Sequence, residues 1–90
     1  MLHAFDPVFV WERLGTRRAI GDVLRAAEWL TEQWPADYRG SDLHVQAMEL
    51  CLLELEGGAR PDEVRAMFVE AAFEAEILAL DIRPTFSWAP

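Results

Sequence analysis

Residues 22–35 read DVLRAAEWLTEQWP and indicate one amphipathic helix with a defined start and stop. Asp22 is a favourable N-cap, because its side-chain oxygen can accept a hydrogen bond from a free backbone N–H of the first turn. Pro35 disfavours the helical conformation at Trp34 and therefore ends the helix there. Apolar residues recur at helical spacing and predict the buried face, which comprises Val23, Ala27, Leu30 and Trp34.

Two further helices are expected downstream. Ser41 can cap a helix over about residues 42–56, and Gly57 and Gly58 can end it in a left-handed conformation. This second helix is apolar around most of its circumference, so we expect it to be the central one. Pro61 suits the first position of a third helix. The predicted core stripe of that helix comprises Val64, Phe68, Ala71, Ala72 and Ala75.

The segment before the first helix favours a β-hairpin. Residues 8–13 are rich in β-branched and aromatic types, residues 14–16 supply a turn, and residues 17–20 can return as a second strand. Residues 77–82 are apolar enough to add a short third strand near the C-terminus. The sequence therefore predicts an α+β fold, in which an N-terminal β-hairpin packs on three helices.

Length and composition indicate a single small domain over residues 1–90. The apolar fraction is 52% and the charged fraction 27%, both ordinary for a globular chain. A chain of this size can bury one core without a disulfide or a metal ion. Residues 83–90 form a tail that contains two prolines together with Phe86 and Trp88.

The net charge of −8 argues against a general binder of nucleic acid or of anionic membranes, because phosphate groups require clustered cations. All eight basic residues are arginine, and Arg13, Arg17 and Arg18 form the only local cluster. A nucleic-acid-associated role would have to use these three residues. We therefore regard nucleic acid as the weakest of the partners considered.

The expected compartment is the cytoplasm. Cys51 is the only cysteine and cannot form an intramolecular disulfide, which suits a reducing environment. The sequence shows neither a cationic start with a long apolar run nor a segment of membrane-spanning length, so we expect no membrane association. These features favour a bacterial cytoplasmic protein.

Several motifs occur in a fixed order along the chain. The first is an aromatic-led Pro-Val-x-Val start at residues 5–10, and the second is an Ala-Ala-Glu-aromatic-Leu helix at residues 26–30 that ends in Trp-Pro. A Pro, an acidic pair, Arg-x-x-Phe and an Ala-rich helix occupy residues 61–75. Between them lies a series made of His44, Ala47, Cys51 and Gly57. In these motifs the chain resembles a small family of bacterial proteins described only as a domain of unknown function.

The resemblance covers roughly residues 5–78 and leaves the aromatic tail outside it. Two positions depart from the pattern of the family. Arg60 stands where a capping serine is usual, and Glu76 stands where a glycine usually follows the Ala-rich helix. The resemblance implies no activity, no cofactor and no catalytic residue.

His44 and Cys51 are the only pair of residues that could carry redox or metal chemistry. Their spacing of seven places both on the same face of the second helix. The pair could be a nucleophile with its base or half of a metal site, but no third group stands at helical spacing. Apolar neighbours would keep the thiol inert. We therefore expect a packing role, with a small redox or metal-linked protein as the alternative.

The remaining apolar residues suggest an interaction surface. Trp29 lies off the predicted face of its helix, and helices that cover one face of the hairpin would leave its other face uncovered. The candidate interaction residues are Phe9, Trp11, Trp29, Val69 and Phe73. We expect a non-enzymatic interaction module without a cofactor, which forms a homodimer or binds another protein. The tail is a third candidate to cover this surface.

Overall fold

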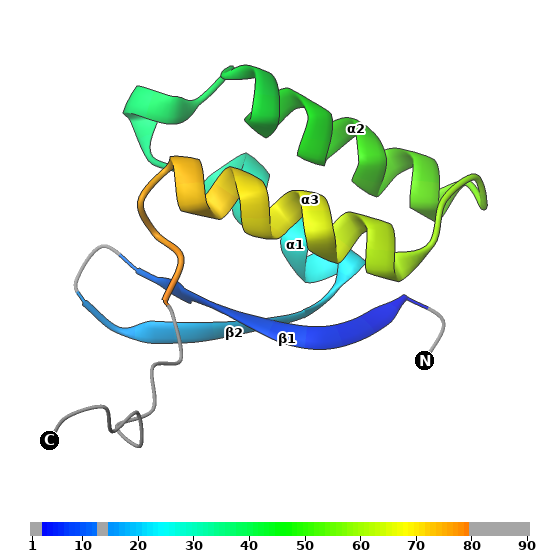
Figure 1. The fold of residues 1–90 in the computed structure, drawn as a ribbon, viewed down its shortest axis with the longest axis horizontal. Coiled ribbons are helices and arrows are strands. Elements are labelled where there is room, and N and C mark those ends of the chain that lie inside the picture. The colour runs from blue at the N-terminus through cyan, green and yellow to red at the C-terminus, as the bar shows by residue number, and fades with distance from the viewer. Residues whose placement is uncertain (1–2, 13–14, 80–90) are drawn as a thin grey trace, which may run out of the picture.

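The computed structural model describes residues 3–12 and 15–79, and these residues form the predicted α+β fold (Figure 1). An antiparallel β-hairpin packs on three α-helices. The elements are β1 (Ala4–Trp11), β2 (Arg17–Asp22), α1 (Val23–Glu32), the short 3-10 helix η1 (Ala36–Tyr38), α2 (Asp42–Leu55) and α3 (Pro61–Glu74). The predicted tail at residues 83–90 lies outside the described residues.

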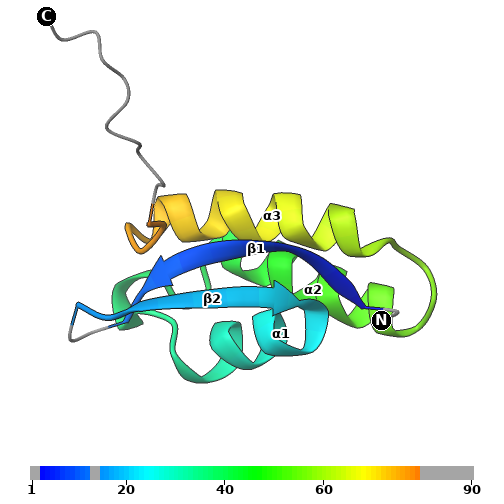
Figure 2. The same ribbon diagram turned by 90° about the horizontal axis from the view of Figure 1, so that it is seen from below.

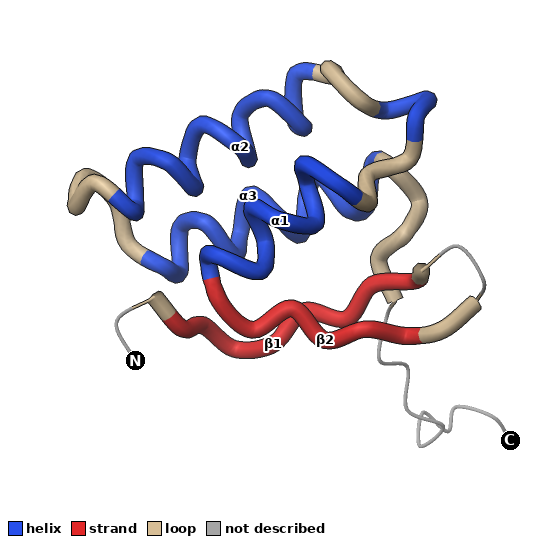
Figure 3. Tube along the Cα trace, turned by 180° about the vertical axis from the view of Figure 1, so that it is seen from behind, coloured by secondary structure: helices blue, strands red, loops and turns tan. Residues whose placement is uncertain are grey.

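The elements form three layers. α3 packs against β1 and α1 packs against β2, so both helices cover the same face of the hairpin (Figure 2). α2 packs on α1 and α3 and lies on the side away from the strands (Figure 1). Figure 3 shows this order from behind, with the strands at one edge of the molecule and α2 at the other. The core therefore lies mainly between the hairpin and the pair α1 and α3.

The hairpin alternates its side chains between two environments. Val8 and Val10 are buried against the helices, whereas Phe9 is half-buried and Trp11 is exposed on the other face. This alternation follows from the period of two in a β-strand. A register irregularity between Ala4 and Val8 interrupts the pairing of the two strands.

A third segment pairs with β1 on the edge opposite β2. Leu78 forms an antiparallel bridge with Val10, and backbone hydrogen bonds flank this bridge on both sides. This segment covers the first half of the predicted third strand at residues 77–82. Residues 80–82 lie outside the described part of the chain.

The helix boundaries follow the predicted capping residues. Asp22 accepts a hydrogen bond from the Arg25 backbone N–H at 2.8 Å, and Ser41 accepts one from the His44 backbone N–H at 3.2 Å. Gly57 adopts a φ of 88° directly after α2, in the left-handed region that favours glycine. Local sequence therefore determines the starts of α1 and α2 and the end of α2.

The predicted central position of α2 is wrong, because α3 is the central helix. α3 contacts β1, α1 and α2, and it buries Val64, Phe68, Ala71 and Ala72. The small alanine side chains permit close approach of the neighbouring elements. α2 buries His44, Ala47, Cys51 and Glu54, while four other apolar side chains remain exposed: Val45, Leu52, Leu53 and Leu55.

The placement of Trp29 outside the core is also wrong. α1 buries Val23, Ala26, Trp29 and Leu30, and Trp29 is only 7% exposed. Ala27, which the predicted stripe included, is only half-buried. Trp34 is 3% exposed as expected, but it lies beyond the end of α1 at Glu32.

Candidate functional site

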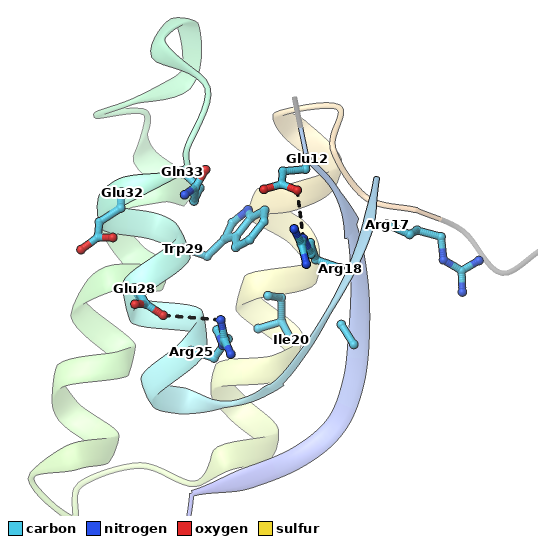
Figure 4. A pocket seen from close by; sticks show the side chains of 10 residues that line it. Glu12, Arg17, Arg18, Ile20, Arg25, Glu28, Trp29, Glu32 and Gln33 are labelled. Carbon is cyan, nitrogen blue, oxygen red and sulfur yellow. Dashed lines mark hydrogen bonds and ion pairs between the residues drawn. The ribbon is translucent and has the colours of Figure 1, made fainter. Parts of the chain in front are cut away.

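A groove of about 480 Å³ lies between β2 and α1. Figure 4 shows Trp29 projecting from α1 toward β2, between Gln33 and the Glu12–Arg18 pair. Ile20 of β2 lies deeper in the same groove and is fully buried. The groove therefore combines an apolar floor with charged residues along both of its walls.

The hydrogen bonds between β1 and residues 77–79 show in which direction the backbone N–H and C=O groups of β1 point. The Trp11 N–H donates to the Ile77 carbonyl at 2.7 Å, and the Ala79 N–H donates to the Phe9 carbonyl at 2.8 Å. In an antiparallel sheet, the N–H and C=O of one residue point to the same side, and the side alternates along the strand. The alternate residues of β1 therefore direct their backbone groups toward β2.

This alternation identifies the free groups of β2. Ile20 and Arg18 are the partners of those alternate residues of β1, so their backbone groups face β1. Ala19 consequently directs its N–H and C=O groups away from β1. The alternation does not extend to Gly21, because the register shifts beyond Ile20 and the Val23 N–H donates to the His3 carbonyl of the β1 side at 3.0 Å. Among the described residues, no strand pairs with this edge of β2. The groove thus borders an open sheet edge.

The charges along the groove are arranged in order. β2 begins with Arg17 and Arg18 and ends with Asp22, whereas α1 carries Arg25 in its first turn and Glu32 at its end. Two ion pairs connect these side chains with their neighbours. Arg18 lies 2.9 Å from Glu12, and Arg25 lies 3.8 Å from Glu28. In chain order, β2 and α1 therefore each begin with a positive charge and end with a negative one.

The structure divides the five predicted interaction residues among three elements. Phe9 and Trp11 lie on β1, Trp29 on α1, and Val69 and Phe73 on α3. Phe73 is 69% exposed and Trp11 is also exposed, whereas Phe9 and Val69 are half-buried. The Arg17 guanidinium covers the Phe9 ring at 4.6 Å from its centre.

Trp11 and Trp29 come together at a second hollow of about 630 Å³, where Trp34 also contributes to the wall. The indole N–H groups of Trp29 and Trp34 are both buried and have no hydrogen-bond partner among the described residues. An unpaired buried donor costs about 1–3 kcal/mol. Trp29 therefore acts chiefly through its packing, although its edge lines both hollows.

The exposed apolar residues of α2 were missed by sequence reasoning. Val45, Leu52, Leu53 and Leu55 were assigned to a central helix, and Leu24 of α1 was not considered. Leu52 is 61% exposed, and Leu24 is 59% exposed. The spacing of three and four residues between exposed positions on α2 was the available signal.

His44 has a structural role in the connection between α1 and α2. Its Nε2 lies 2.9 Å from the Leu30 carbonyl, and its Nδ1 accepts a hydrogen bond from the Gly40 N–H at 3.0 Å. A neutral ring with the proton on Nε2 satisfies both contacts. The ring also stacks near Trp34, with 5.6 Å between the ring centres. These contacts occupy both ring nitrogens.

Cys51 lies in the core and is 1% exposed. Burial, together with the nearby Glu54 carboxylate, raises the pKa of the Cys51 thiol to about 11. Glu54 is itself buried, and both of its carboxylate oxygens lie within 3.0 Å of His3 Nδ1. Such a thiol is a poor nucleophile near neutral pH. Within the described ranges, no cluster of three or more His, Cys, Asp or Glu side chains is arranged to hold a metal ion.

The predicted arginine cluster is already engaged in contacts within the hairpin. Arg17 covers Phe9 and Arg18 pairs with Glu12, while Arg13 lies outside the described residues. In residues 3–12 and 15–79, none of the helices combines the length and apolar character needed to cross a bilayer.

The fold, an open-edged hairpin backed by three helices, defines a small α+β class. The chain belongs to the DUF982 family, which is described as a protein family of unknown function and whose sequence profile matches residues 6–79. This finding confirms the resemblance inferred from the motifs.

A solved structure supports the same assignment. The Agrobacterium tumefaciens protein Atu1219, whose structure was solved by NMR, is 30% identical to this chain in sequence. The two structures superpose with a TM-score of 0.76. The similarity covers 98% of this chain and 86% of that protein. No curated protein matches the chain at a significant level. Neither the family nor the solved structure assigns an activity.

Proposed function

We propose that this chain is a non-enzymatic interaction module that forms a two-fold homodimer by pairing β2 with β2 of a second copy. The observation that supports this proposal is the open edge of β2, where Ala19 directs its backbone groups away from β1. An unpaired edge beside a groove with an apolar floor is a template for a further strand. In a second copy of the chain, β2 has the same unpaired edge, so the two edges can pair with each other.

The order of charges favours an antiparallel arrangement of the two copies. When the paired strands are centred on Ala19, whose outward N–H and C=O groups then pair with those of Ala19 in the second copy, Arg17 and Arg18 of one copy lie opposite Gly21 and Ile20 of the other, away from its arginines. The same two-fold axis directs Arg25 of one α1 toward Glu32 of the other. A parallel register would instead place the arginines of the two edges together and would be unfavourable. Two-fold symmetry also reuses one surface on both subunits.

The cytoplasm is the proposed setting for this dimer. The buried free thiol of Cys51 needs no oxidising compartment. Burial raises the pKa of the Cys51 thiol, and both ring nitrogens of His44 are engaged in contacts with the backbone. These two observations support a non-enzymatic role.

Sedimentation equilibrium of Ala19→Pro tests the strand pairing directly. Proline at this position removes an N–H that points away from β1, so the intramolecular ladder of the hairpin stays intact. We expect wild-type protein to dimerise and Ala19→Pro to dimerise more than about tenfold more weakly. Ala19→Ser retains the N–H and is the matched control. Equal dimerisation of all three proteins would exclude the β2 edge.

A charge exchange on α1 tests the orientation of the two copies. Arg25→Glu should weaken the dimer, because it places two carboxylates together at each end of the interface. The double variant Arg25→Glu/Glu32→Arg should restore dimerisation, because the opposite charges again face each other. A monomeric wild-type protein over a wide concentration range would contradict the proposal.

A further inference from the structure

The outer side of α2 carries an apolar seam with the spacing of a coiled coil. The seam consists of Val45, Met48, Leu52 and Leu55, which recur at intervals of three and four residues. Met48 is half-buried, and the other three are exposed, with Leu52 at 61%. Residues at this spacing share one face of a helix and form the contact positions of helix pairs.

No described element covers this seam. α2 is the outermost layer and contacts only α1 and α3 extensively among the described elements (Figure 1). α1, which packs beside it, also exposes Leu24. Four of the seven large apolar side chains that the described residues expose lie on α2: Val45, Leu52, Leu53 and Leu55. Such a concentration on one helix is typical of a protein-binding surface.

An acidic row runs along one border of the apolar seam. It consists of Asp42, Glu49 and Glu56, which are exposed and separated by seven residues each. In a coiled-coil pattern these residues occupy the position that flanks the seam and determines the choice of partner. The sequence contains no arginine or lysine between Arg39 and Arg60. The aspartate and glutamate side chains of α2 therefore have no lysine or arginine beside them on the same helix.

The acidic row disfavours a second copy as the occupant of the seam. An antiparallel pair of α2 helices would place the two acidic rows beside each other, with Glu49 near Glu49 of the second copy. In a parallel pair, the acidic row would meet the opposite flank of the seam, where Cys51 is buried and offers no cation. A partner helix with lysine or arginine at its flanking positions avoids both problems.

We propose that the apolar seam and acidic row of α2 bind a basic amphipathic helix of another protein. The apolar side chains of the partner would pack between Val45, Leu52 and Leu55, and its cations would pair with the acidic row. This interface lies on the opposite side of the molecule from β2. It is therefore independent of the proposed dimer and can be occupied at the same time.

Titration calorimetry with two designed helical peptides tests this inference. Both peptides contain about three heptads with leucine at the contact positions, and they carry either lysine or glutamate at the flanking positions. The full chain should bind the lysine peptide and bind the glutamate peptide at least about tenfold more weakly. Higher salt should weaken the first interaction, because exposed charge pairs are screened.

Three variants locate the binding to the seam. Leu52→Asp should reduce the affinity for the lysine peptide more than about tenfold. Leu53→Asp is the matched control, because Leu53 is also exposed, at 44%, but lies across the acidic row from the seam. Glu49→Lys/Glu56→Lys should reverse the preference and favour the glutamate peptide. Circular dichroism would verify that each variant remains folded.

Two results would overturn the inference. The first is equal affinity for both peptides, which would show that the acidic row does not select the partner. The second is self-association that Leu52→Asp abolishes and Ala19→Pro leaves unchanged, which would make a second copy the occupant of α2. Sedimentation of the same variants distinguishes these results from a failure of the β2 dimer.

Discussion

Replacing Glu76 with glycine is expected to relieve a local backbone strain. Glu76 has a φ of 62°, in the left-handed region that costs a residue with a Cβ roughly 1–2 kcal/mol. Glycine avoids this cost but loses about 0.5–1 kcal/mol through the greater freedom of its unfolded chain. The substitution also removes the hydrogen bond that the Tyr38 hydroxyl donates to the Glu76 carboxylate at 3.1 Å.

Comparison with Glu76→Ala isolates the backbone effect, because alanine also loses that hydrogen bond yet retains the strain. We expect Glu76→Gly to be more stable than Glu76→Ala by about 0.5–1 kcal/mol, which corresponds to roughly 2–8 °C in Tm for a domain of this size. Urea unfolding followed by tryptophan fluorescence measures the difference. If Glu76→Ala is as stable as Glu76→Gly, the left-handed conformation at this position is refuted.

Four further variants test the packing, a helix terminus and the buried thiol. Trp29→Ala and Trp34→Ala should each lower the free energy of unfolding in urea by about 3–5 kcal/mol, because both side chains are buried. A small loss for Trp29→Ala alone would show that the Trp29 side chain lies on the surface. Arg60→Ser should raise the free energy of unfolding by about 0.5–1 kcal/mol. The arginine side chain has no atom that can accept a hydrogen bond from the first turn of α3, whereas a serine hydroxyl can. The other half of the capping box is already present, because the Glu63 carboxylate accepts from the Arg60 N–H at 2.8 Å. The thiol of Cys51, with its pKa raised to about 11, stabilises the fold below the unfolded pKa of about 8.5 and loses that contribution as the pH rises toward 11. The wild-type protein should therefore lose about 2–3 kcal/mol more than Cys51→Ala over this interval, and parallel pH profiles would contradict the raised pKa.

The order and type of the elements were predictable because local signals determine them. Asp22 and Ser41 cap their helices as expected, and Gly57 ends α2. The alternation of Val8 and Val10 with Phe9 likewise indicated which face of β1 is buried. Each of these features depends on neighbouring residues alone.

The orientation of α1 was not predictable from the stripe that ends at Trp34. α1 ends at Glu32, so the helical period does not determine the direction of the Trp34 side chain. Including Trp34 rotated the predicted face away from Trp29, which packs toward β2. Without that residue, the apolar spacing of Val23, Ala26 and Leu30 agrees with the buried face.

The layer order could not be predicted from composition. α2 is the more apolar helix, yet α3 is central because Ala71 and Ala72 allow it to fit between the hairpin and α2. Small residues in a helix weaken the hydrophobic signal while they favour close packing. The exposed face of α2 was missed for the same reason. The open edge of β2 depends on long-range pairing of β1 with Leu78, which no local pattern reports.

Hydrogen exchange at the backbone amides of β2 is the most direct measurement of the proposed dimer. The amides of Arg18 and Ile20 face β1 and should be protected at every protein concentration. The amide of Ala19 faces the open edge, so its protection should rise with concentration as the second strand pairs. Rapid exchange of Ala19 at every concentration, with Arg18 and Ile20 protected, would show that water rather than a second copy occupies this edge.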